Sequence, residues 1–200
     1  MKNKDLKHEI IKAAYKAFAK ASYRKVSTND IVDDAGVSKG LLFHYFKNKK
    51  SLYLTLYEMA WLIIHKEIFE DFPYEEQDVF ERLKYLILRK SQAMQEHKTL
   101  TSFIKQVHMN DDKEIAKKRS AMYHAFQQKN YKRVFENIDT SLFKRPDYHD
   151  EIFKVVTWTF NKLTHDWEKQ HAHKETHESI TILEEELCHY TNFFKQYFYS

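Results

Sequence analysis

Apolar residues recur at helical spacing along most of the 200-residue chain. In the first segment, Leu6, Ile10, Ala14 and Phe18 share one face, which predicts a helix over about 5–21. With capping residues and two prolines as breaks, the same periodicity predicts further helices at about 27–36, 38–46, 49–72, 75–97, 99–109, 112–138, 147–171 and 177–198. We therefore predict an all-α chain of about nine helices.

The composition supports a helical protein with a large core. Only two glycines and two prolines are available for tight turns, and 42% of the residues are hydrophobic. The single Cys188 cannot form an internal disulfide, which is typical of a reducing compartment. The longest uncharged apolar run, at 59–64, is much shorter than the roughly 20 residues of a membrane span. We predict a cytoplasmic protein with no membrane partner.

Positive charge is concentrated near the N-terminus. Residues 1–55 contain 12 Lys and Arg against 5 Asp and Glu, whereas the remaining 145 residues contain 21 against 24. This asymmetry is typical of a nucleic-acid-binding segment attached to a neutral body. A basic, solvated terminal helix would give the same balance, so charge alone leaves both interpretations open.

Both glycines of the chain lie within five residues of one another, at Gly36 and Gly40. They fall where two short predicted helices meet at a tight turn, an arrangement typical of a helix-turn-helix. Gly36 suits the end of the first of these helices, where a positive φ is often required. Gly40 lies in the first turn of the next helix, where glycine costs up to about 1 kcal/mol relative to alanine. We interpret Gly40 as room for DNA to approach the backbone; packing against the first helix is the alternative.

Several cations stand near the start of the helix predicted at 49–72. Lys49 and Lys50 fall in its first turn, at the positive end of the helix dipole, and Lys39 and Lys47 precede them. A phosphate chain passing this helix start would compensate for their charge. A merely solvated helix terminus is the alternative.

The segment 13–53 resembles the DNA-binding domain of the TetR family of bacterial transcriptional regulators. The resemblance covers about a quarter of the chain and rests on Ser27, Thr28, Ile31, the run from Ala35 to Ser38, Gly40, the aromatic run ending at Phe46, and the residues Lys47, Asn48 and Lys49. It implies an N-terminal three-helix helix-turn-helix DNA-binding domain at 1–48. It also implies a larger helical effector-binding and dimerisation domain at 49–200.

The resemblance further implies which side chains meet DNA, while Leu42 and Phe46 point inward. The implied DNA-binding residues are Thr28, Asn29, Ser38, Lys39, Gly40, Phe43, His44, Tyr45, Lys47 and Lys49.

The chain departs from the family pattern at three places. Phe43 stands where tyrosine is common, so its contact with DNA is expected to be apolar, for example with a thymine methyl group. His44 and Tyr45 exchange the more usual order of an aromatic residue and a histidine. Lys50 and Ser51 stand where acidic residues are frequent, so we expect tighter and more salt-sensitive DNA binding.

The effector pocket that the family implies is less legible in the sequence. Candidates for its lining are Trp61, His65, Phe103, Gln106, Tyr123, Phe126 and Trp158, although an ordinary core position is the simpler interpretation of each. Arg119 and Arg133 could face an anionic ligand such as a fatty acid or an acyl thioester, or could lie on a solvated face. The aromatic richness would also suit a planar or cationic molecule.

The last two predicted helices carry the apolar stripes expected of a dimer interface. The helix at 147–171 has one face with Val156 and Phe160 and a second with Trp158, which indicates burial on two sides. Burial within one chain is the alternative. We therefore predict a homodimeric, ligand-responsive repressor that binds a palindromic operator in double-stranded DNA and is released by a small-molecule effector. The competing hypothesis is a helical protein-interaction module whose basic N-terminus binds an acidic partner.

The sequence carries no motif for catalysis or for a cofactor. A P-loop, a nucleophile elbow and the H-E-x-x-H pattern are all missing, so we predict neither an enzyme nor a bound cofactor. His171, His173 and His177 invite comparison with a metal site, but no second ligand cluster accompanies them at fixed spacing. We predict no metal site there.

Overall fold

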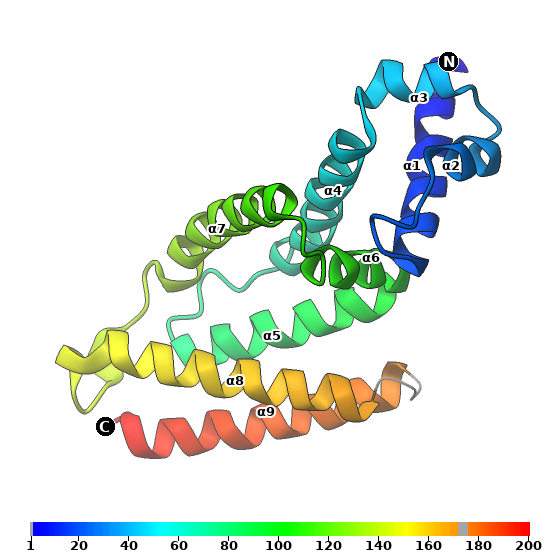
Figure 1. Ribbon diagram of the computed structural model, residues 1–200. Helices are drawn as coiled ribbons and strands as arrows, with labels where there is room; N and C mark the ends of the chain where they lie inside the picture. Colours follow the sequence, from blue (N-terminus) through cyan, green and yellow to red (C-terminus); the bar gives the residue numbers. More distant parts are fainter. Residues whose placement is uncertain (1, 172–175) are drawn as a thin grey trace. The chain divides into compact units, whose positions relative to one another are not determined.

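The computed structural model describes residues 2–171 and 176–200, with side chains for all of these except 2–5, 127, 129–132, 171, 176 and 177. Its described part contains nine α-helices and no β-strand, which confirms the predicted all-α fold (Figure 1). The helices are α1 (Lys2–Lys20), α2 (Thr28–Ala35), α3 (Lys39–Phe46), α4 (Lys49–Phe69), α5 (Val79–Glu96), α6 (Lys98–His108), α7 (Lys113–Phe135), α8 (His149–His171) and α9 (Thr176–Phe198).

Local capping explains where several of these helices begin. The carboxylate of Asp78 accepts a hydrogen bond from the backbone N–H of Phe80 at 2.9 Å, so α5 begins at Val79 and not near the predicted residue 75. Asp112 caps α7 in the same way through the N–H of Ile115 at 3.0 Å. Two short 3₁₀ turns, at Thr140–Leu142 and Pro146–Tyr148, join α7 to α8 and were not predicted.

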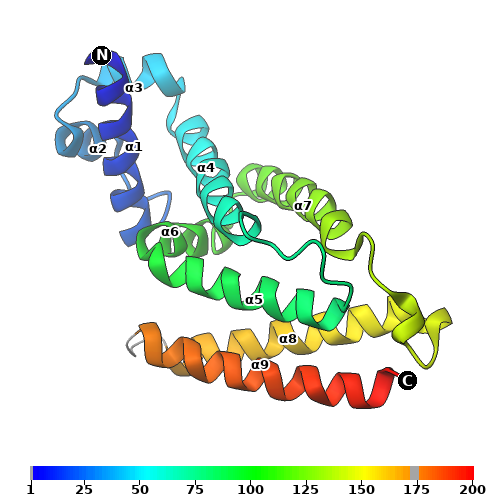
Figure 2. The same ribbon diagram turned by 180° about the vertical axis from the view of Figure 1, so that it is seen from behind.

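The chain forms two compact units. The first comprises residues 1–64 and 96–127, and in it α1 packs against both α2 and α6, as both views of the ribbon show (Figure 2). Its core is an aromatic cluster around the fully buried Phe103 of α6, whose ring centroid lies 5.4 Å from that of Tyr15 and 5.2 Å from that of Tyr53. The Tyr15 hydroxyl donates to the carbonyl oxygen of Leu56 at 2.7 Å, which fixes α1 to α4.

The second unit comprises residues 65–95 and 128–200 and contains α8 and α9 side by side. Its core is also aromatic, and Phe80, Phe143, Phe160 and Phe194 are all buried. The division into compact units does not test the predicted functional boundary between residues 48 and 49, which stays a prediction.

A buried arginine ties three segments of the second unit together. Arg82 of α5 is only 1% exposed, and its guanidinium donates to the carbonyl oxygens of Val134 at 3.0 Å and Glu136 at 2.6 Å, at the end of α7. It also donates to the carbonyl oxygens of Tyr74 and Glu76, in the connection between α4 and α5. One side chain therefore satisfies four backbone acceptors that would otherwise be costly to bury.

None of the helices in the described part of the chain is long and apolar enough to cross a membrane.

Candidate nucleic-acid interface

The turn between α2 and α3 is only three residues long and is built by backbone hydrogen bonds. Gly36 has φ 64°, and its N–H donates to the carbonyl oxygen of Asp33, while the N–H of Val37 donates to that of Val32 at 3.0 Å. This is the hydrogen-bond pattern of a Schellman motif, which needs a left-handed residue at the first position after the helix. Gly36 is therefore explained by its backbone conformation, as the sequence predicts.

The second helix of the motif, α3, presents two distinct faces. Ser38 caps it by accepting a hydrogen bond from the N–H of Leu41 at 3.2 Å. Leu42 and Phe46 lie one turn apart and are 0% and 3% exposed, which confirms that they point inward. Gly40 and His44 are also one turn apart, on the opposite side of the helix, and both are exposed.

Gly40 has open space in front of it. A Cβ atom built there would meet, among the described residues, only the Oγ of Ser38 at 3.9 Å, an ordinary contact distance. No described atom of α1 therefore packs against this glycine. The conformational cost of glycine inside a helix, up to about 1 kcal/mol, is not offset by a close neighbour among the described residues. Gly40 and His44 thus form a shallow, open face on α3.

The connection from α3 to α4 places Lys47 in an unusual backbone conformation. Lys47 has φ 58° and ψ −51°, and the N–H of Asn48 donates to the carbonyl oxygen of Phe46 at 2.6 Å across it. This geometry is close to that of a γ-turn, which is strained for a residue with a side chain. Asn48 then caps α4 by accepting from the N–H of Ser51 at 2.8 Å. The exposed Lys47 is thereby held between α3 and α4. No signal in the sequence indicates that its backbone is strained.

The other predicted DNA-binding residues differ in their exposure. Asn29, Ser38 and Lys39 are exposed, whereas Thr28, Phe43, Tyr45 and Lys49 are partly buried. The ring centroids of His44 and Tyr45 are 5.4 Å apart. The Nζ atom of Lys7, in α1, lies 5.9 Å from the centroid of the Tyr45 ring. Lys7 is thus a cation beside α3 that sequence reasoning missed, because the contact joins residues far apart in the chain.

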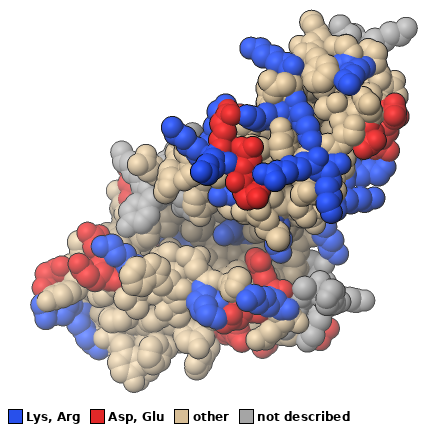
Figure 3. Space-filling view, viewed as in Figure 1, with Lys and Arg blue, Asp and Glu red and all other residues tan. Residues whose placement is uncertain are grey.

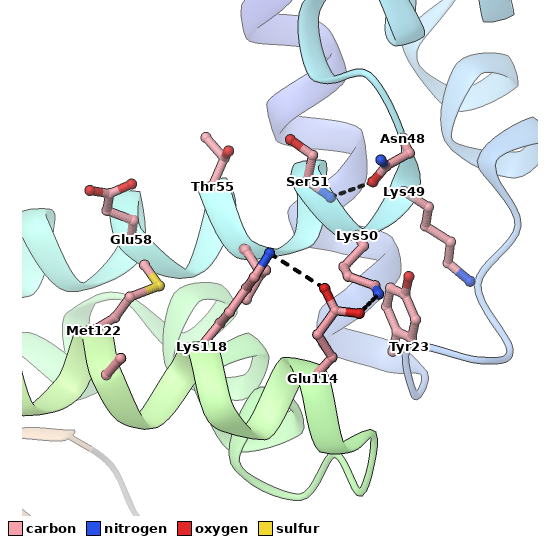
Figure 4. A pocket seen from close by; sticks show the side chains of 12 residues that line it. Tyr23, Asn48, Lys49, Lys50, Ser51, Thr55, Glu58, Glu114, Lys118 and Met122 are labelled. Atoms are coloured by element: carbon pink, nitrogen blue, oxygen red, sulfur yellow. Dashed lines mark hydrogen bonds and ion pairs between the residues drawn. The ribbon is translucent and has the colours of Figure 1, made fainter.

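The two lysines at the start of α4 have different surroundings. The Nζ atom of Lys49 lies 4.4 Å from the centroid of the Tyr23 ring, and partial burial lowers the pKa of Lys49. Lys50 instead forms an ion pair with Glu114 of α7 (Figure 4). The hydrogen bond that Lys50 donates to Glu114 raises the pKa of Lys50, and the same contact lowers the pKa of the Glu114 carboxyl. A side chain of the protein therefore compensates the charge of Lys50. The expected tighter and more salt-sensitive DNA binding stays a prediction.

Basic side chains are prominent on the first unit in the space-filling view. Figure 3 shows Lys and Arg around its helices on this face, with acidic side chains among them. Lys16 pairs with Asp34 at 2.8 Å and Arg24 with Asp111 at 3.6 Å, so part of the positive charge is locally balanced. Lys39, the first residue of α3, and Lys47, directly after its end, are both exposed.

The predicted effector-binding residues are divided between the two compact units, and only His65 and Trp158 belong to the second. Trp61 and Tyr123 do lie together, with ring centroids 6.0 Å apart, and Tyr57 lies beside Trp61. Phe103 belongs to the aromatic core, and His65 stacks on Phe69 at 4.5 Å. Gln106 and Phe126 are partly buried, whereas the Trp158 side chain is 68% exposed on α8.

Both arginines that were considered for an anionic ligand already have partners within their own unit. The guanidinium of Arg119 donates to the carbonyl oxygens of Val107 at 3.0 Å and His108 at 2.8 Å. Arg133 donates to the hydroxyl of Tyr74 and lies over its ring, 5.2 Å from the centroid. Their positions therefore give no support for an anion-binding role.

No group of three or more metal-binding side chains occurs among the residues that the structure describes. The side chains of His171, His173 and His177 lie outside the described residues.

Sequence comparison identifies the N-terminal segment. Residues 10–56 match the family model described as bacterial regulatory proteins, tetR family. The chain is also 33% identical over 72 residues to the transposon Tn10 TetC protein of Escherichia coli. That match spans 32% of this chain and 36% of TetC, so it covers about a third of the relative.

Structural comparison extends the likeness to nearly the whole chain. The fatty acid degradation regulator FadR of Bacillus halodurans has a TM-score of 0.67 at 18% identity, over 90% of this chain and 93% of that one. A TetR family regulator of Chloroflexus aurantiacus has a TM-score of 0.65 at 18% identity, over 98% and 94%. The turn and the exposed helix that follows it form a helix-turn-helix, which lies inside the segment that matches the family model. Residues 10–56 thus match the tetR family of bacterial regulatory proteins, and the fold of the chain is similar to that of these solved regulators.

Proposed function

We propose that this protein is a transcriptional repressor that binds a palindromic operator as a homodimer and is released by a small-molecule effector. The observation that carries the proposal is the open face of α3, where Gly40 and His44 are exposed opposite the buried Leu42 and Phe46. A helix that is exposed on one side and packed against the protein core on the other can enter the major groove of DNA.

The residues around this face divide by the kind of contact that their chemistry allows. Lys39, Lys47 and Lys49 would bind phosphates and set the position of α3 on the duplex. Asn29 and His44 would read base edges, because their side chains offer hydrogen-bonding groups. Thr28, Ser38, Phe43 and Tyr45 would complete the contact surface.

Homodimerisation is supported by exposed apolar side chains on α8 and α9. Trp158 is 68% exposed, Tyr197 59%, Phe193 46% and Val155 44%. Exposed apolar residues gathered on neighbouring helices are typical of a protein–protein interface. In the dimer, the two copies of α3 would lie roughly 34–36 Å apart and enter successive major grooves on one side of the operator.

For the effector, the aromatic group of Trp61 and Tyr123 is the best-supported contact. Trp61 lies on α4, the helix that begins at Lys49, so about 18 Å of helix join the proposed effector contact to the proposed phosphate contact. A FadR of Bacillus subtilis with the same fold, at a TM-score of 0.64 and 18% identity over 90% of this chain and 96% of that one, was solved in complex with stearoyl-CoA. To release DNA, the effector needs only to bind the conformation that does not bind the operator more tightly than the conformation that does.

Selection of bound sequences from a random pool of duplex DNA tests the proposal. We expect a palindromic site, bound at physiological salt by a dimer and lost when His44 and Tyr45 are both changed to alanine. Binding that ignores sequence would overturn the proposal and would favour the protein-interaction module with an acidic partner. An effector that tightens operator binding, or leaves it unchanged, would contradict release as the mechanism.

A further inference from the structure

A hollow of about 760 Å³ lies within the first unit, between the start of α4 and the first turns of α7 (Figure 4). None of the seven predicted effector-binding residues lines it. Its charged lining residues are Lys49, Lys50, Glu58, Glu114 and Lys118. It is therefore distinct from the aromatic group of Trp61 and Tyr123, and its lining includes Lys49, a proposed phosphate contact.

Glu114 lies between two ammonium groups in this hollow. One carboxylate oxygen pairs with Lys50, and the other lies 3.5 Å from the Nζ atom of Lys118. The Lys50 side chain is 32% exposed and that of Glu114 is 55% exposed, so water reaches both partners. A pair of this kind is weak and exchanges easily, because solvent screens the attraction and can replace either partner.

DNA would offer Lys50 the same chemistry that Glu114 offers it. Lys50 directly follows Lys49, and both lie in the first turn of α4, where the helix dipole also favours an anion. A phosphate near Lys49 would therefore compete with the Glu114 carboxylate for the Lys50 ammonium. The two anions cannot be close to Lys50 together without repelling one another.

We propose that Glu114 is an intramolecular competitor of DNA phosphate, which holds Lys50 away from the operator and so lowers the affinity of the protein for DNA. This inference rests on the proposed DNA-binding function. It makes α7 a regulator of the charge that α4 presents: when Glu114 moves away, one more cation per protomer becomes available to DNA. Tyr123, a proposed effector contact, lies on the same helix nine residues later.

The test compares Glu114→Gln with Glu58→Gln. Both substitutions remove one negative charge from the same hollow, but only Glu114 is paired with Lys50. We expect Glu114→Gln to tighten binding to the selected operator by up to about fivefold for each protomer. The plot of log affinity against log salt should also steepen by about 0.9 for each phosphate newly contacted. Glu58→Gln should change neither quantity by as much.

A double variant tests whether the gain in operator affinity depends on Lys50. Adding Lys50→Ala to Glu114→Gln should abolish the gain, because the released cation is then absent. Equal effects of Glu114→Gln and Glu58→Gln, or a gain that persists without Lys50, would overturn the competition. Wild-type protein that fails to select any DNA sequence would instead overturn the proposed function itself, so the two failures are distinguishable.

Discussion

The ammonium group of Lys49 lies over the face of the Tyr23 ring, 4.4 Å from its centroid. Tyr23 belongs to the connector between α1 and α2, so this contact links the connector to the start of α4. The ring restricts where the ammonium can lie before DNA arrives. Tyr23 is therefore a positioning residue for a proposed phosphate contact, although it carries no charge itself.

Replacing the aromatic ring should weaken DNA binding. We expect Tyr23→Leu to lower operator affinity by about two- to fivefold, since a cation–π contact at a partly exposed site contributes about 0.5–1 kcal/mol. Tyr23→Phe, which keeps the ring, should bind as the wild type does. Affinity is measured by fluorescence anisotropy with the selected operator. Equal losses in both variants would assign the effect to the hydroxyl group and not to the ring.

Gly40→Ala should change stability and DNA binding in opposite directions. A methyl group fits at this position without a clash, so the free energy of unfolding should rise by up to about 1 kcal/mol. Operator affinity should fall at least tenfold if DNA approaches the backbone here. Denaturant unfolding and operator titration on one preparation measure both quantities. A stabilised variant with unchanged affinity would mean that nothing contacts DNA at Gly40.

Arg82→Leu should destabilise the protein severely. Leucine fills part of the space but leaves four partly or fully buried carbonyl oxygens without their donor, so we expect a loss of about 3–5 kcal/mol in the free energy of unfolding. Arg145→Leu is the matched control, because Arg145 is exposed and pairs locally with Asp147. It should change stability by less than about 1 kcal/mol. Similar losses in both variants would show that the Arg82 hydrogen bonds contribute little.

Trp158→Ser should weaken the proposed homodimer without unfolding the protomer. The side chain is already exposed in the single chain, so removing it costs little core packing. Tyr148→Ser serves as the control, since Tyr148 is 49% exposed but lies before α8. Sedimentation equilibrium should give at least a tenfold weaker dimer for Trp158→Ser only. An unchanged dimer constant would place the interface elsewhere.

Stability should decrease in acid partly through Glu81. Burial raises the pKa of this carboxyl, but the hydrogen bonds and charges of Lys195 and Lys84 lower it by more. The pKa of Glu81 therefore lies below the ordinary 4.5. A lowered folded-state pKa gives stability that is present above the unfolded pKa and lost as pH falls through the folded one. Between pH 5 and pH 3, Glu81→Gln should therefore lose less stability than the wild type, by up to roughly 1 kcal/mol. Parallel curves for both proteins would contradict this assignment.

The sequence predicts the helices and the inner face of the motif well, because these depend on local periodicity and capping. Leu42 and Phe46 are buried as their spacing indicates, and Gly36 has the positive φ that its place after a helix suggests. What it does not predict is contact between distant residues. Glu114 lies 64 positions after Lys50, and nothing in either neighbourhood indicates that the two form a pair.

The sequence does not predict which side chains of the candidate effector site are buried. Phe103 and Trp158 are both aromatic residues on apolar helix faces, yet one is fully buried and the other is mostly exposed. Periodicity locates an apolar face but does not say whether the core, a ligand or a second protomer covers it.

Arg82 has a consequence for how the second unit opens. Its guanidinium is shared by the α4–α5 connection and the end of α7, so detaching either segment alone would leave a charge in the interior with too few acceptors. Amide protons in these two segments and in the first turns of α5 should therefore exchange with solvent at a common rate, as one cooperative block.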